Sequence, residues 1–177
     1  MSIQEEIVTE LKRIFGDSNV KLEWDVAKDS KDEYTRKIYC PRIDVAVGPF
    51  NIDKNTYLNN RRITEAYEKH RTLIERIKSI SDVPNQSMLL NENPRCLLAI
   101  ELENKSSRKH RLGSMINASA MGKIGIILAA NPSVFKSIVK IREYLKFIES
   151  VGKARYNLGN LITVLVDDFL DFLKKYR

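Results

Sequence analysis

The chain has 177 residues, of which 43% are hydrophobic and 30% are charged, and its formal net charge is +7. That length fits a single domain over residues 1–177 with a real core, and the composition is that of an ordinary globular protein. No apolar run approaches the ~18 residues of a membrane span and no apolar signal segment opens the chain, which excludes a spanning protein and predicts a cytoplasmic one without membrane contact. The basic balance favours a polyanionic partner.

The first fifty residues read as a helix followed by strands. Ser2 and Glu5 form a capping box, and an apolar face with helical spacing then continues to Gly16. Alternating residues predict a half-buried strand over 20–26, and a polar turn at 28–32 leads through Tyr34–Cys40 to a strand over 43–47.

Residues 51–95 form a predicted helical insertion between two strands. A helical pattern runs from about Thr56 to Ser79, and Asp82–Pro94 is polar, contains two prolines and is expected to be a loop. One apolar stripe repeats with heptad spacing along this helix and consists of Ile63, Tyr67, His70, Ile74 and Ile77. The stripe needs cover, and we expect a homodimer that pairs through it, with packing on the parent domain as the alternative.

The second half alternates strands and helices. A central strand is predicted over Cys96–Glu103, followed by a helix that Ser106 or Ser107 caps and that runs to about Met121. A strand over Lys123–Ala130 and a helix from Asn131-Pro132 to near Gly152 come next. The last two elements are a strand over Leu161–Val166 and a helix over Phe169–Tyr176, capped by Asp167 and Asp168. This pattern indicates an α/β fold with a mixed central sheet flanked by helices.

The two cysteines, Cys40 and Cys96, each precede one of the two strands that carry the candidate acidic residues. Without a secretion signal we expect both thiols to be reduced and structural, rather than joined in a disulfide. The sequence contains no CxxC motif and no cluster of His and Cys, so it does not indicate a zinc site.

Acidic residues gather at the two strands within segments 41–44 (PRID) and 97–105 (LLAIELENK). Glu101, Glu103 and Lys105 follow one another at every second position, so a strand places all three on one face. Asp44 on an adjacent strand would join them. Carboxylate oxygens beside a cation suit Mg²⁺ or Mn²⁺ together with a phosphate group.

These two segments resemble the PD-(D/E)xK nuclease superfamily, which includes restriction endonucleases and Holliday-junction resolvases. The resemblance implies a core of helix, three-stranded meander, helix and strand. This order matches residues 2–130, and the helix, strand and helix of residues 131–177 then form a C-terminal extension. It also implies a Mg²⁺- or Mn²⁺-dependent endonuclease that acts on DNA.

Two registers of the family motif are open. Glu101 follows the apolar run directly, and Glu103 then occupies the position of the usual lysine. Alternatively, Glu103-Asn104-Lys105 is itself the (D/E)-x-K motif. We prefer the first register, in which Asp44, Glu101 and Glu103 hold metal and Lys105 contacts phosphate.

Further candidates lie on two helices. Several family members place a glutamate of the first helix in the site, which here selects Glu10, beside the apolar stripe of that helix. A solvent-exposed Glu10 is the alternative. Candidate contacts to DNA are grouped on the helix after the third strand, whose N-terminal dipole also favours anions, and they are Arg108, Lys109, His110, Arg111, Ser114 and Asn117.

Three functions remain compatible with these residues. The first is a metal-dependent deoxyribonuclease, and the second is an inactive nuclease-like domain that binds nucleic acid or a protein partner, for which the irregular lysine position is the reason. The third is an interaction module built around the insertion helix.

Overall fold

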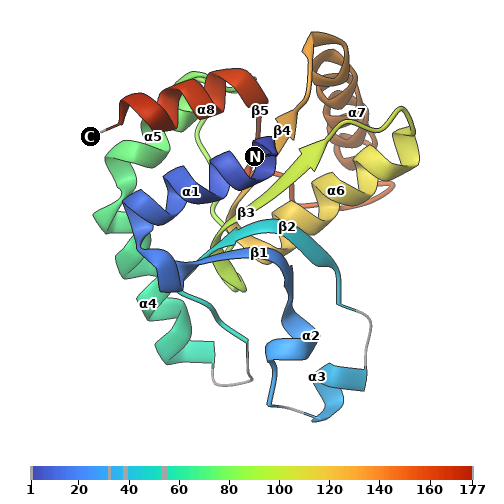
Figure 1. The fold of residues 1–177 in the computed structure, drawn as a ribbon. Coiled ribbons are helices and arrows are strands. Elements are labelled where there is room, and N and C mark those ends of the chain that lie inside the picture. The colour runs from blue at the N-terminus through green and yellow to red at the C-terminus, as the bar shows by residue number, and fades with distance from the viewer. Residues whose placement is uncertain (1, 32, 38–39, 53–55, 177) are drawn as a thin grey trace.

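Five strands form one mixed sheet with helices on both faces in the computed structural model, which describes residues 2–31, 33–37, 40–52 and 56–176 (Figure 1). The strands are β1 (Val20–Asp25), β2 (Arg42–Val47), β3 (Cys96–Glu103), β4 (Gly122–Ala129) and β5 (Leu161–Leu165). The predicted α/β fold is therefore confirmed.

The helices follow the predicted order with local additions. They are α1 (Ile3–Phe15), α2 (Val26–Asp29), α3 (Glu33–Lys37), α4 (Thr56–Lys69), α5 (Arg71–Ser79), α6 (Arg108–Met121), α7 (Pro132–Ser150) and α8 (Val166–Lys175), with a 3₁₀ turn, η1, at Asp17–Asn19. The Ser2–Glu5 capping box is present, Ser107 caps α6, and Asn131 caps α7 ahead of its proline.

The strands lie in the spatial order β1-β2-β3-β4-β5. The pairs β1/β2 and β2/β3 are antiparallel, so the first three strands form a meander. The pairs β3/β4 and β4/β5 are parallel, and α6 and α7 make the two crossovers. A parallel pair needs such a long connection, whereas antiparallel neighbours do not.

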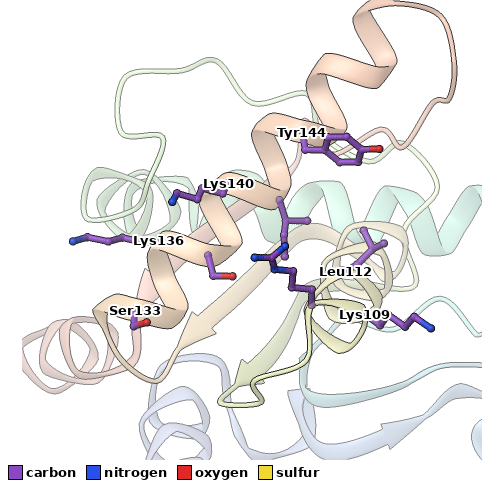
Figure 2. Close-up of a pocket in the computed structure, with 9 residues that line it drawn as sticks. Lys109, Leu112, Ser133, Lys136, Lys140 and Tyr144 are labelled. Carbon is purple, nitrogen blue, oxygen red and sulfur yellow. The ribbon is translucent and has the colours of Figure 1, made fainter.

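Helices α6 and α7 cover one face of the sheet. Ile127 and Ala129 of β4 pack in a cluster with residues of these helices. Gly125 lets α6 approach, because a Cβ at this position would lie 2.7 Å from the backbone carbon of Ala118. A groove lies between α6 and α7, and Figure 2 shows side chains of both helices lining it.

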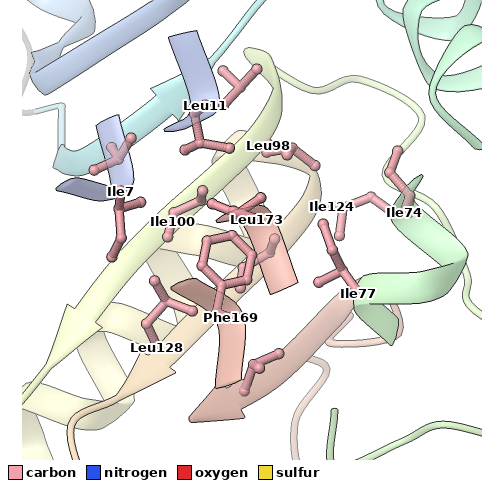
Figure 3. Packing of buried hydrophobic residues seen from close by; sticks show 14 of the residues in the cluster. Ile7, Leu11, Ile74, Ile77, Leu98, Ile100, Ile124, Leu128, Phe169 and Leu173 are labelled. Atoms are coloured by element: carbon pink, nitrogen blue, oxygen red, sulfur yellow. The ribbon is translucent and has the colours of Figure 1, made fainter. Parts of the chain in front are cut away.

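The largest core lies on the other face, where α1, α4, α5 and α8 pack on the sheet. Figure 3 shows its centre, in which side chains of β3 and β4 meet those of α1, α5 and α8. The labelled residues are Ile7, Leu11, Ile74, Ile77, Leu98, Ile100, Ile124, Leu128, Phe169 and Leu173. The insertion therefore shares one core with the parent sheet.

The structure corrects the predicted insertion helix, which is two helices that meet at His70. The backbone of His70 leaves the helical conformation (φ −106°, ψ 14°), and its ring contacts that of Phe15, with ring centroids 4.5 Å apart and the planes tilted by 48°. The break lets both α4 and α5 bury the apolar stripe: Ile63, Ile74 and Ile77 are at most 1% exposed within one chain. The apolar stripe is therefore buried within a single chain. A homodimer stays a prediction, and it would have to pair through a surface other than this stripe.

Other boundaries also differ from the expectations. The polar turn expected at 28–32 is occupied in part by α2, which Asp25 caps through the N–H of Ala27. The described part of the segment Tyr34–Cys40 is helical up to Lys37, and residues 38–39 lie outside the described residues. Asp167 and Asp168 do not cap α8: they lie in its first turn, where the helix dipole favours acidic side chains. Both cysteines are free thiols.

None of the helices in the described parts of the chain is both long and apolar enough to cross a membrane.

One buried ion pair connects the loop after α5 to the parallel half of the sheet. Arg142 of α7 donates to Asp82 at 2.5 Å, and each side chain is 3% exposed. Asp82 also accepts from the N–H of Thr163 in β5 at 2.8 Å.

Replacing Asp82 by alanine is predicted to lower the free energy of unfolding by about 3–5 kcal/mol, because Arg142 would stay buried without its counter-charge. Urea denaturation measures the change. The control is Glu68→Ala, which removes a solvent-exposed pair with Arg71 and should cost less than about 1 kcal/mol. Equal effects of the two substitutions on the free energy of unfolding would show that the buried pair stabilises the fold no more than the exposed pair.

Candidate active site

Asp44 and Glu101 face each other across β2 and β3. The antiparallel register pairs Val45 with Ile100, so the next position along each strand brings Asp44 opposite Glu101. Their carboxyl groups are joined by a hydrogen bond. Asp44 Oδ2 also accepts from the N–H of Leu102 at 2.8 Å, which fixes the carboxylate against the end of β3.

The environment of this pair disfavours two negative charges. Glu101 is 6% exposed, and burial, then the charge and hydrogen bond of Asp44, raise the pKa of its carboxyl to about 9. Burial also raises the pKa of Asp44, although the N–H of Leu102 opposes this shift. Two carboxyls this close titrate as a pair. A pKa of about 9 keeps Glu101 protonated at neutral pH, where its carboxyl donates to Asp44.

Glu103 is held by three donors rather than by the pair. It is 1% exposed; its Oε1 accepts from the N–H of Lys105 at 2.7 Å, and its Oε2 accepts from Ser114 Oγ at 3.2 Å. His110 Nδ1 lies 3.1 Å from the same Oε2. His110 and Ser114 were predicted to contact DNA, and the structure places them on Glu103, where they dock α6 against the end of β3.

Lys105 and Arg111 shape the loop between β3 and α6. Lys105 is exposed, and its ammonium makes no hydrogen bond or ion pair with the described part of the chain. Its carbonyl accepts from Nε and Nη2 of Arg111, whose Nη1 donates to Ser137 of α7. Within the described residues, the Lys105 ammonium thus has no partner and is available to an external anion.

The start of α1, rather than its middle, reaches the site. Gln4 donates to the backbone carbonyl of Asp44 and to Glu23 of β1, each at 3.2 Å. Glu10 instead pairs with Arg13 at 2.9 Å, and Arg13 donates to the carbonyl of Leu173 in α8. The structure therefore does not bring Glu10 together with Asp44.

Glu23 is an acidic neighbour that the sequence reasoning missed. It lies between the paired positions of β1 and β2, level with Asp44, and its charge raises the pKa of both Asp44 and Glu101. Its backbone is left-handed (φ 50°), a conformation that costs a non-glycine residue about 1–3 kcal/mol and that is frequent at functional sites. The alternation of β1 places Glu23 on a polar face, but neither the register nor this φ is readable from sequence.

The remaining predicted contacts are divided between two places. Arg108 and Lys109 line the groove between α6 and α7, and Asn117 is half-buried further along α6. Only His110 and Ser114 of the predicted set touch the acidic cluster.

The predicted metal trio is not assembled as such. Among the described residues, no group of three or more His, Cys, Asp or Glu side chains converges closely enough to hold a metal ion. Asp44 and Glu101 are in contact, whereas Glu103 is turned to α6. The arrangement is therefore a pair of carboxyls with a third carboxylate behind it.

The raised pKa of Glu101 predicts a pH-dependent stability. Between pH 4.5, the ordinary value, and about 9, the folded chain holds a proton that the unfolded chain lacks. The stabilisation by this proton is complete below pH 4.5 and is lost as the pH rises through 9, with a slope of up to about 1.4 kcal/mol per pH unit. Glu101→Gln keeps a donor to Asp44 and should flatten this slope in urea denaturation.

The matched control is Glu65→Gln on the exposed face of α4, which should leave the slope unchanged. If Glu101→Gln and the unsubstituted protein show parallel pH profiles, Glu101 is ionised in the fold and the shared proton does not exist.

No protein-family model, curated protein or solved structure matches the chain.

Proposed function

We propose that the protein is a Mg²⁺- or Mn²⁺-dependent endonuclease that hydrolyses phosphodiester bonds in DNA. The observation that carries the proposal is the contact between the carboxyls of Asp44 and Glu101 on neighbouring strands. Burying two acids side by side is costly unless a cation compensates them, so such pairs are typical of functional sites.

The order and direction of the elements support a restriction-endonuclease-like core. Helix α1, the antiparallel meander β1-β2-β3, helix α6 and the parallel strand β4 follow in the order that the resemblance requires. Asp44 lies on the second strand of the meander, and Glu101 lies on the third. This contact also favours the first register of the motif, in which Glu101 is the acidic residue and Glu103 occupies the position of the usual lysine.

The pair fits the ligand preference of a small divalent cation. Mg²⁺ is commonly held by one or two carboxylates together with substrate phosphate oxygens, so the absence of a third converging ligand in the described residues does not conflict with it. Asp44 and Glu101 would hold the ion, which supplies an activated water and neutralises charge on the phosphate. Glu103 would join them only by giving up a bond to α6.

The basic residues beside the pair fit the rest of the reaction. Lys105 presents a free ammonium at the end of β3, where it can bind the phosphate that is being cleaved. Loss of the proton from Glu101 when a cation binds would turn a protonated pair into two ligands. The chain thus binds phosphate and moves a proton with its own groups.

Plasmid DNA should be nicked by the purified protein in Mg²⁺ or Mn²⁺ and left intact in EDTA. Asp44→Asn and Glu101→Gln should each lower the rate by about a hundredfold or more, since each removes charge stabilisation at the phosphate. Gel electrophoresis gives the rate, and circular dichroism verifies the fold. Glu65→Gln serves as a control with unchanged cleavage. Retained cleavage by folded Asp44→Asn protein would refute the proposed site.

A second function is favoured by one specific observation. Glu103 stands where the family usually has its catalytic lysine, and three donors already occupy it. A carboxylate in that place can be an internal tie rather than a catalytic group. The same fold would then bind nucleic acid or a protein without cutting.

Calorimetry with Mn²⁺ separates the two functions without an activity assay. A site made by Asp44 and Glu101 should bind Mn²⁺ more tightly as the pH rises from 7 to 9, by up to about tenfold per unit, because one proton must leave. Glu103→Gln should lower stability but not this affinity. No heat that depends on Asp44, combined with salt-sensitive DNA binding, would favour the inactive domain.

A further inference from the structure

A basic groove lies between α6 and α7, outside the acidic cluster. It has a volume of about 750 Å³, a size that accommodates small organic ligands. Four cationic residues, three hydroxyls and two apolar residues line it, and they are Arg108, Lys109, Lys136, Lys140, Ser133, Ser137, Tyr144, Leu112 and Ile141. No acidic residue lines it, although the chain contains 23 of them. The lining is therefore selective for an anion.

The groove also offers aromatic surface. Figure 2 shows Ser133, Lys136, Lys140 and Tyr144 in succession along α7, with Lys109 and Leu112 on α6. Tyr144 is 61% exposed, and Phe147, one turn further along α7, is 60% exposed. The Tyr144 ring, this open on a basic groove, can stack on a nucleic-acid base, while Leu112 and Ile141 provide apolar lining.

The groove is connected with the acidic site through one turn of α6. His110 touches Glu103, whereas its neighbour Lys109 lines the groove. Arg111 joins the carbonyl of Lys105 to Ser137, itself a lining residue of α7. A strand that runs from Glu103 across the start of α6 therefore enters the groove.

We propose that this groove binds a single-stranded DNA segment next to the site of cleavage. Its cations would follow the phosphates, and Tyr144 would stack on a base. A single strand is favoured over a duplex because only unpaired bases offer their faces to an aromatic ring. That the ligand is DNA rests on the proposed function, whereas the basic lining of the groove and its exposed Tyr144 ring are independent of that function.

Fluorescence anisotropy in EDTA tests the groove without cleavage. The probes are a labelled single-stranded oligonucleotide and a duplex of the same length. Lys136→Ala/Lys140→Ala should weaken single-strand binding at least about tenfold and lower the salt slope by about 0.7 for each lysine. Tyr144→Ala should weaken it by about tenfold, whereas Tyr144→Phe, which keeps the ring, should bind normally.

The matched control is Arg62→Ala/Lys69→Ala, which removes two exposed cations from α4 on the other face of the sheet. It should retain affinity and salt slope, and circular dichroism checks that all variants fold. Unchanged binding by the groove variants, an equal loss for the duplex, or an equal loss in the control would each overturn the inference.

Cleavage assays separate this inference from the proposed function. If the protein cleaves plasmid DNA but the groove variants bind the single strand as well as the unsubstituted protein does, the groove proposal fails and the nuclease proposal stands. Groove-dependent binding by a protein that cuts no DNA would reject the nuclease and leave the groove as a binding site.

Discussion

The antiparallel pairing of β2 with β3 is the constraint on which the site depends. It brings Val45 opposite Ile100 and thereby Asp44 opposite Glu101. A slip of one residue would turn the side chains of one strand to the other face and separate the two carboxyls. The register is held by the main core, because Val45, Val47, Leu98 and Ile100 are fully buried on that face. Hydrophobic packing on one side of the sheet thus enforces contact between two acids on the other.

Behind this pair, the end of β3 and the start of α6 form one polar unit. Glu103 ties the loop N–H of Lys105, His110 and Ser114 together, and Arg111 extends the connection to α7. Gly125 allows α6 to lie close enough to the sheet for these bonds. Neighbouring residues of one turn of α6 therefore contact Glu103 and line the basic groove. A change in α6 would affect both.

Local signals in the sequence predicted the element order well. The Ser2–Glu5 capping box and the Asn131 cap can be predicted from a few neighbouring residues, and they define where α1 and α7 begin. The alternation of β3 also predicted that Glu101 and Glu103 share a face. The break at His70 was not predictable from the helical pattern, and the ring of His70 there contacts Phe15, a residue far away in the sequence. The same holds for Glu23 and Gln4, which reach Asp44 only through the register of β1 and the docking of α1. Sequence therefore located the acidic pair, and tertiary packing determined its neighbours.

We propose that the carboxyl pair of Asp44 and Glu101 exchanges its proton for a divalent cation. A crystal soaked in Mn²⁺ and measured at the manganese absorption edge tests this most directly. We expect one anomalous peak within coordination distance of an oxygen of each residue, with their mutual hydrogen bond lost. A map without a peak at this position, in a crystal where Asp44 and Glu101 remain hydrogen-bonded, would contradict it.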